Sequence, residues 1–204
     1  MAPESHEHSS PAHDPFVPRL NSTPQTKYYC PLDCDSGPSN KFLIKSASTP
    51  YKYWSGREGD CNANSPAVSL LSDKSEATTF QSQNLSKGNG DVDYTQFLLP
   101  DKQAKGSCPR VPSAYAWPSP DALKEGHLAV TGINDIDDDF ELTQFRVYPI
   151  DIEDTACEGP VIIRSKEGKK YLSMNKMSDF ELKTTNPNKA TRWLIDFKSS
   201  GQCS

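Results

Sequence analysis

Short runs in which hydrophobic and polar residues alternate make up most of the chain. Residues 180–184 read Phe-Glu-Leu-Lys-Thr and residues 145–147 read Phe-Arg-Val, so apolar side chains recur at every second position. A period of two is typical of a β-strand with one buried face. Turn residues separate the runs, as at Gly168 and in residues 186–188. The pattern predicts twelve strands, at residues 41–46, 51–55, 67–72, 77–82, 94–99, 113–117, 127–131, 140–148, 160–165, 169–173, 179–184 and 190–197.

One short stretch, residues 119–125, has the features of a helical turn. Ser119 stands where a helix cap is expected, and Pro120 takes the first helical position, where a missing N–H costs nothing. We therefore predict an all-β fold that contains a single turn of helix.

The same succession of elements is repeated along the chain, in units at about residues 41–93, 94–150 and 157–198. An apolar run ending in Ser is followed by a Tyr-containing strand, a further strand, and a Thr-x-aromatic triplet. The first and third units match well, and the middle unit keeps the pattern only loosely. Self-similarity of this kind predicts an architecture built from repeated supersecondary units.

The third unit resembles the repeat of β-trefoil proteins, including fascin-like trefoils, arabinose-binding modules and ricin-B-like lectins. The residues that carry the resemblance are Ile163, Ser165, the Tyr171-Leu172 pair, Leu182 and the run 190–195. The resemblance implies that six strands close a short barrel while six form hairpins that cover one end. A β-sandwich or jelly roll is the alternative fold, because alternation alone does not determine topology.

Aromatic residues recur at matching positions of the units, and we interpret them as core rather than as ligand platforms. Large rings contribute most of the buried surface of a small β core, and packing symmetry would repeat them. The residues concerned are Tyr53, Tyr115, Tyr171, Phe80, Phe145 and Trp193.

Residues 1–26 differ in composition from the rest of the chain. They contain five Pro and three of the four His, and almost no large apolar side chains. Such a segment cannot bury enough surface to offset its ordering entropy, so we predict a disordered polar tail followed by one domain over 27–204. We assign His6, His8 and His13 to this tail rather than to a metal site, and we expect no metal or cofactor.

Charge and motifs exclude several functional classes. The net charge of −5 is mild, and Lys and Arg are not clustered, which argues against a nucleic-acid partner. No apolar run approaches the length of a membrane span. His127 is the only His of the predicted domain, and no catalytic motif is present, so we expect a non-enzymatic protein. The acidic run 134–141 lacks the Gly that a calcium loop needs, since Phe140 stands there, and we interpret it as a solvated turn.

Cysteines and glycosylation sequons favour a secreted protein. The six Cys form an even set without paired metal-site spacing, and sequons occur at Asn21 and Asn84. Secretion requires that a leader was removed and that Met1 was supplied by expression, because no apolar stretch follows it. In a trefoil the chain ends meet, which implies that Cys203 pairs with Cys30 or Cys34. We expect Cys61 and Cys108 to pair with each other or with Cys157.

The resemblance to trefoil lectins suggests a glycan-binding protein, expected as a monomer. Sugar sites combine an aromatic face with side chains that hydrogen-bond hydroxyl groups. The first unit offers such a set, and the second unit a smaller one, although the Gln-x-Trp triplet of ricin-type lectins is missing. The candidate residues are Tyr51, Tyr53, Trp54, Asp60 and Asn62, and separately Tyr115 and Trp117.

Protease inhibition, or an effector that binds a host protein, is the alternative function. Trefoil inhibitors present rigid loops from the barrel, and the long insertions at 55–66 and 100–126 contain Cys and Pro. Arg110, between Cys108 and Pro112, is a candidate for a trypsin-like specificity pocket. The simpler interpretation is that Pro and Cys stiffen a long connection.

Overall fold

The computed structural model describes residues 32, 41–56, 67–86, 92–100, 113–132, 141–151 and 157–197. Several sequence predictions concern residues outside these ranges and stay predictions. They are the tail 1–26, the acidic run up to residue 140, Asn21, Asp60, Asn62, Arg110, and the cysteines Cys30, Cys34, Cys61, Cys108 and Cys203.

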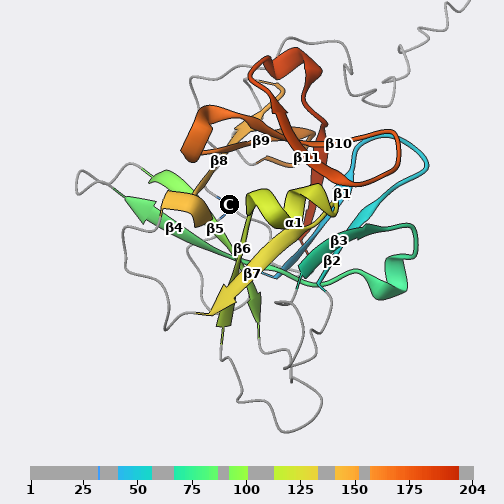
Figure 1. The fold of residues 1–204 in the computed structure, drawn as a ribbon, viewed down its shortest axis with the longest axis horizontal. Helices are drawn as coiled ribbons and strands as arrows, with labels where there is room; N and C mark the ends of the chain where they lie inside the picture. The colour runs from blue at the N-terminus through green and yellow to red at the C-terminus, as the bar shows by residue number, and fades with distance from the viewer. Residues whose placement is uncertain are drawn as a thin grey trace, which may run out of the picture.

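The described chain is all-β, as predicted, with twelve antiparallel strands and one short α-helix (Figure 1). Each predicted run overlaps a strand of the structure. The strands are β1 Phe42–Ser46, β2 Tyr53–Gly56, β3 Ala67–Leu71, β4 Gln81–Ser86, β5 Val92–Pro100, β6 Ser113–Trp117, β7 Leu128–Gly132, β8 Phe145–Pro149, β9 Val161–Ser165, β10 Tyr171–Met174, β11 Phe180–Thr184 and β12 Trp193–Phe197.

Helix α1, Pro120–Lys124, forms where the sequence predicted it, with Pro in its first turn. Ser119 occupies the cap position, as predicted, but its side chain makes no capping hydrogen bond. The prediction that this side chain caps the helix is therefore wrong. The backbone closes the turn instead, because the N–H of Glu125 donates to the carbonyl of Ala122 at 3.0 Å. Among the described residues, no helix has the length and apolar composition that crossing a bilayer requires.

Six strands are joined in a continuous circuit of backbone pairings. β1 pairs with β12, β12 with β9, β9 with β8, β8 with β5, and β5 with β4. The circuit returns to β1 through a bridge between Phe42 and Phe80, whose N–H groups donate to each other's carbonyls at 3.0 and 2.8 Å. This bridge is why β4 begins later than predicted: Phe80 pairs with β1 before the ladder with β5 begins. Pairing around a circuit satisfies backbone groups that an open sheet would expose at its edges.

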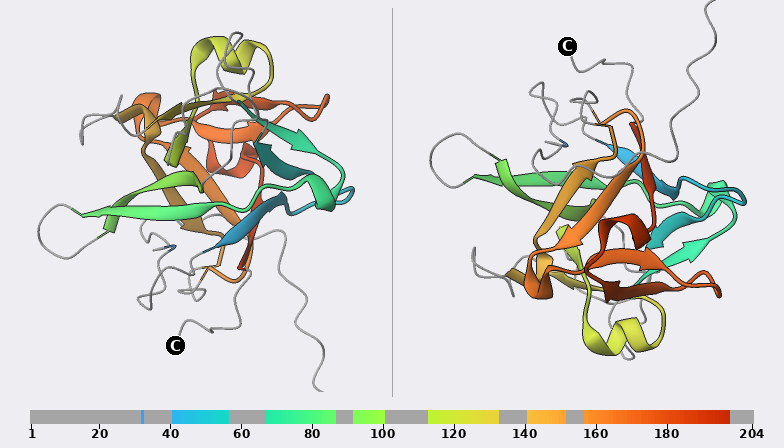
Figure 2. Two further views of the ribbon diagram at one scale, coloured as in Figure 1. Left: turned by 90° about the horizontal axis from the view of Figure 1, so that it is seen from below. Right: turned by 90° about the horizontal axis from the view of Figure 1, so that it is seen from above.

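The other six strands form three hairpins, β2 with β3, β6 with β7, and β10 with β11. The first two hairpins are joined, since β3 pairs with β7. Helix α1 connects β6 to β7 and lies against β7 and β11. Figure 2 shows α1 covering one end of the molecule, beside the β10–β11 hairpin.

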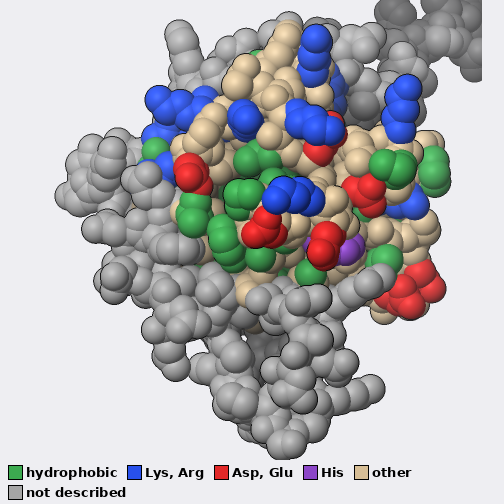
Figure 3. All heavy atoms as spheres, in the orientation of Figure 1, with side chains coloured by type: hydrophobic (Ala, Val, Ile, Leu, Met, Phe, Trp, Pro, Cys, Tyr) green, Lys and Arg blue, Asp and Glu red, His purple; other side chains and the backbone are tan. Residues whose placement is uncertain are grey.

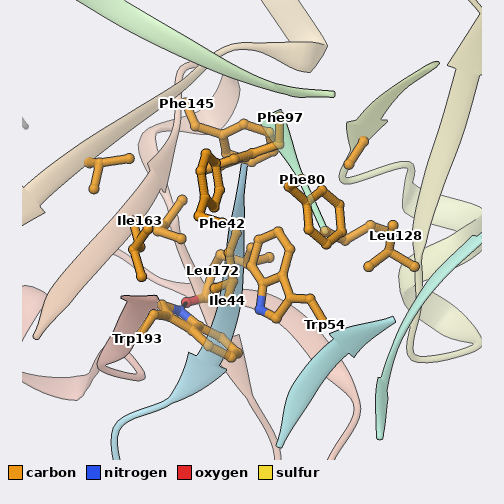
Figure 4. Packing of buried hydrophobic residues seen from close by; sticks show 14 of the residues in the cluster. Phe42, Ile44, Trp54, Phe80, Phe97, Leu128, Phe145, Ile163, Leu172 and Trp193 are labelled. Atoms are coloured by element: carbon orange, nitrogen blue, oxygen red, sulfur yellow. Dashed lines mark hydrogen bonds between the residues drawn. The ribbon is translucent and has the colours of Figure 1, made fainter. Parts of the chain in front are cut away.

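The larger of two core clusters receives apolar side chains from all three units (Figure 4). Trp54 is at its centre and is fully buried. Its ring lies 5.8 Å from Phe80, 5.1 Å from Phe180 and 5.5 Å from Trp193, each nearly perpendicular to it. Edge-to-face pairs contribute about 0.5–1.5 kcal/mol each beyond the area they bury.

The predicted core aromatics are all buried, but they divide between two layers. Phe80, Phe145 and Trp193 belong to the central cluster, whereas the three tyrosines do not. Tyr171 packs on a second cluster with Ile162, and the central cluster takes the residue after each tyrosine instead, namely Trp54, Ala116 and Leu172. Within each of these strands, successive side chains point to opposite faces.

Candidate functional site

The first predicted ligand cluster does not form a common surface. Trp54 is fully buried and Tyr53 is only 8 % exposed, so neither ring offers a face to a ligand. This corrects the assignment of Trp54, whose ring belongs to the core because the sheet turns that face of β2 inward. Tyr51 is exposed, and the ammonium of Lys45 lies 5.0 Å from the centre of its ring.

The second predicted pair lies on β6, which is separated from β2 by two other strands. Tyr115 is buried, and its hydroxyl donates to Oε1 of Gln83 at 2.9 Å. Trp117 is half-buried and lies opposite Ala129 of β7. The structure therefore separates these aromatics from Tyr51, because β3 and β7 lie between them.

Two further predicted residues are described by the structure. Asn84 accepts a hydrogen bond from the Thr95 hydroxyl at 2.9 Å, while its amide nitrogen is buried and has no partner among the described residues. A glycan would attach to that nitrogen, so glycosylation of Asn84 needs it to become exposed. Cys157 is buried and disulfide-bonded, and its partner lies outside the described residues, so the predicted pairing stays untested.

His127 does not lie in a metal or catalytic cluster. Its Nδ1 is 3.1 Å from the hydroxyl of Ser69, on the neighbouring strand β3. Within the ranges that the structure describes, no group of three or more His, Cys, Asp or Glu side chains could hold a metal ion.

A groove of about 410 Å³ lies between α1 and the β10–β11 hairpin. Figure 3 shows apolar side chains at the centre of this face, with charged side chains of both signs around them. We call it the hairpin groove. Its apolar lining comes from Leu123 of α1, Leu182 of β11 and the turn residue Met177, which is 80 % exposed; its polar lining includes Asn175 and Asp179.

The turn between β10 and β11 holds Asp179 in place. Oδ1 of Asn175 accepts hydrogen bonds from the backbone N–H groups of Met177 and Asp179, at 2.8 and 3.0 Å. Nδ2 of Asn175 donates to Oδ2 of Asp179 at 3.2 Å. Asn side chains commonly stabilise turns through such bonds to nearby backbone. The second carboxylate oxygen of Asp179, Oδ1, makes no hydrogen bond within the described part of the chain, so it can accept one from a ligand.

Gly126 allows the helix to approach this carboxylate closely. Its φ of +79° is unfavourable for other residues, and a Cβ built there would lie 2.5 Å from Cβ of Asp179. The carbonyl of Gly126 also accepts a hydrogen bond from the N–H of Phe180 at 3.0 Å. Gly126 therefore joins the end of α1 to the start of β11 and forms part of the groove.

Two ion pairs flank the groove. Lys124 lies 2.8 Å from Asp121 on α1, and Lys183 lies 2.9 Å from Glu181 on β11. The hydrogen bond from Lys124 lowers the pKa of the Asp121 carboxyl, and the same bond raises the pKa of Lys124. In each pair at least one of the two side chains is exposed to solvent. The pairs therefore contribute little to the stability of the fold and mainly determine the charge around the groove.

Sequence reasoning missed this groove. The Asn175 and Asp179 spacing and the isolated Gly126 were visible signals, but each is common in turns that bind nothing. Only the packing of α1 against β11 shows that they lie together. No protein-family model and no curated protein matches this chain.

Proposed function

We propose that this chain is a β-trefoil that binds glycans through the hairpin groove. The pairing circuit supports the fold proposal. Each unit contributes its first and fourth strands to the circuit, while its second and third strands form a hairpin. A β-sandwich would divide the strands between two stacked sheets, whereas here the ladders are continuous.

A repeated hydrogen bond supports the internal symmetry. The hydroxyl of Thr78 accepts from the backbone N–H of Gly56, and that of Thr191 accepts from the N–H of Met174, both at 2.7 Å. In each case the donor lies two residues after the core position of the second strand. The corresponding residue of the middle unit is Pro118, which has no N–H to donate. The middle copy thus departs from the pattern for a chemical reason.

The arrangement of Asp179 is the observation that carries the glycan proposal. A sugar presents hydroxyl groups on its edge and C–H groups on its faces. The held carboxylate of Asp179 can accept from a hydroxyl, and Leu123 and Leu182 provide apolar contact beside it. Few polar groups in fixed positions beside an apolar lining are typical of small-molecule sites. The lectin-like repeats of the sequence favour a sugar as the occupant.

The alternative function, protease inhibition, gains no support from the described residues. It depends on Arg110, which lies outside them. Secretion and the absence of enzymatic activity likewise stay part of the proposal.

The test is an array of neutral glycans, followed by calorimetry with any soluble sugar that binds. Asp179→Asn keeps the size of the side chain and removes its charge, and we expect binding to weaken about tenfold or more, as for a lost charge-assisted hydrogen bond. Asp121→Asn is the charge control: it removes one negative charge from the same face, Asp121 is not part of the groove lining, and the change leaves Asp179 in place while releasing only the ion pair with Lys124. Thermal unfolding verifies that both variants fold.

Absence of glycan binding by the wild-type chain would reject the proposal. Equal loss in Asp179→Asn and Asp121→Asn would assign the effect to surface charge, and the groove would not be the site.

A further inference from the structure

On the outside of the strand circuit, Arg and Lys side chains lie against tyrosine rings and form a second surface of interest. We define the cation–tyrosine face as Arg146 of β8, Arg164 and Lys166 at the end of β9, Tyr94 of β5 and Tyr148 of β8. Figure 3 shows Lys and Arg side chains over the upper part of that view, one group of them at its upper left. This surface is separate from the hairpin groove.

Two arginines lie directly opposite each other in this face. In the antiparallel ladder of β8 with β9, Arg146 pairs with Arg164. Directly opposed side chains on neighbouring strands have Cβ atoms about 4.5–5.5 Å apart, and like charges there are destabilising. Arg146 already takes part in other interactions, including a hydrogen bond with the Tyr148 side chain, so Arg164 is the member of the pair that can receive an anion.

The cationic groups are held in place by aromatic and amide contacts. The guanidinium of Arg146 lies 4.4 Å from the ring centre of Tyr94, and the ammonium of Lys166 lies 4.6 Å from the same centre. Lys166 also donates to Oε1 of Gln144, a buried side chain, at 2.7 Å. Arg164 lies 5.3 Å from the ring centre of Tyr148. Groups ordered before binding lose less entropy when a ligand arrives.

Arg164 has unused hydrogen-bonding capacity. Its guanidinium carries five N–H donors, and within the described ranges its side chain makes no hydrogen bond and no ion pair. Burial raises the pKa of the neighbouring Tyr148 phenol, although the charges of Arg164 and Arg146 partly oppose this, so the ring stays neutral at physiological pH. The positive charge of the face is therefore not cancelled by a tyrosinate.

We propose that the cation–tyrosine face binds the sulfate groups of an acidic polysaccharide. The planar guanidinium fork matches a tetrahedral oxyanion in a bidentate manner, which a point charge cannot do. Lys166 lies two residues after Arg164, just past the end of β9, and Arg146 lies across from Arg164 on β8. A row of cationic groups at this spacing suits a polymer that carries repeated anions.

The tyrosine rings of this face favour a sulfated polysaccharide over nucleic acid, because base stacking needs an open aromatic face. Tyr94 has two cations on its ring and Tyr148 is 1 % exposed, so neither offers an open face for base stacking.

The test measures binding of size-defined heparin oligosaccharides by calorimetry at about 50 and 150 mM NaCl, a range over which charge-driven binding weakens steeply. Three other probes are run beside it: the unsulfated polysaccharide backbone, inorganic sulfate, and a single-stranded oligonucleotide. We expect heparin to bind, the unsulfated chain not to bind, and inorganic sulfate to bind more weakly than heparin.

Arg164→Gln is the decisive variant, because within the described ranges its side chain has no hydrogen bond or ion pair whose loss would disturb the fold. We expect its heparin affinity to fall about tenfold. Arg164→Lys, which keeps the charge but lacks the fork, should recover only part of that loss. The matched control is Lys124→Gln on α1, which removes the same charge elsewhere and should leave the affinity within about twofold.

Failure of heparin to bind at the lower salt, or equal effects of Arg164→Gln and Lys124→Gln, would overturn the proposal. Equally tight binding of the oligonucleotide would also overturn it, since the face would then select charge rather than a sulfated glycan. Asp179→Asn should leave heparin binding unchanged, so failure of the glycan proposal at the hairpin groove can be told apart from failure here.

Discussion

Replacement of Gly126 by Ala tests whether the close approach of α1 to β11 builds the hairpin groove. The new methyl group would lie 2.5 Å from Cβ, 2.7 Å from Cγ and 2.8 Å from Oδ1 of Asp179. Carbon atoms in contact are normally about 3.5–4.0 Å apart, so the helix end or the Asp179 side chain must move by about 1 Å. The carboxylate would then lose the position that the Asn175 turn provides.

Gly168→Ala provides the matched control. Gly168 also has a positive φ, +63°, but a Cβ added there meets nothing within 4 Å. Both variants therefore carry the backbone strain of a left-handed Ala, about 1–2 kcal/mol. Only Gly126→Ala adds the overpacking cost, about 1–3 kcal/mol. The difference in the free energy of unfolding between the variants isolates the steric effect at Asp179.

Urea unfolding at equilibrium measures this difference, and glycan titration measures its consequence. We expect Gly126→Ala to unfold at lower urea than Gly168→Ala and to lose glycan binding, while Gly168→Ala binds like the wild type. Equal destabilisation of the two variants would refute the close approach. Unaltered glycan binding by Gly126→Ala would show that the position of Asp179 does not matter to the ligand.

Three further predictions concern the core and the outer wall. Thr78→Val should destabilise the fold by about 1–3 kcal/mol in urea unfolding, because it removes a buried hydrogen bond to the N–H of Gly56, and Thr191→Val should cost less because its bond is only partly buried. Trp54→Phe should cost less than Trp193→Phe in the same assay, since among the described residues the indole N–H of Trp54 has no partner to lose, whereas that of Trp193 donates to a carbonyl at 3.2 Å. Burial raises the pKa of Tyr148 above its usual value near 10. The neutral phenol therefore contributes its full stability below that value, and the contribution is lost as the pH rises through the folded-state pKa. In Tyr148→Phe the free energy of unfolding should fall less steeply at alkaline pH than in the wild type.

The strands could be predicted because their signal is local. Alternation over four to eight residues reports which side of a strand is buried, and the turn residues between runs mark the ends. The predicted boundaries failed where pairing partners decide them. β4 begins at Gln81 rather than at 77, because Phe80 is bridged to Phe42, a residue far away in the sequence.

The choice of aromatic residue for the core could not be predicted from the sequence. Tyr53 and Trp54 are adjacent, and alternation requires only that they point to opposite faces. Curvature of the sheet around the circuit decides that Trp54 points inward and meets Phe180 and Trp193 from another unit. The sequence alone therefore cannot assign a ligand site to one member of such a pair. Which of the two side chains is buried must be known first, and the tertiary structure decides this.

By itself the sequence determined, for the part of the chain that the structure describes, the all-β class, the positions of the strands and the place of the helix, because hydrophobic period, turn chemistry and helix starts act over a few residues. Only the tertiary structure decided where function can reside. The hairpin groove needs Gly126 beside Asp179, and the cation–tyrosine face needs Arg146 beside Arg164. Such neighbours are set by strand register and helix packing across long stretches of chain, and nothing in the local pattern specifies those contacts.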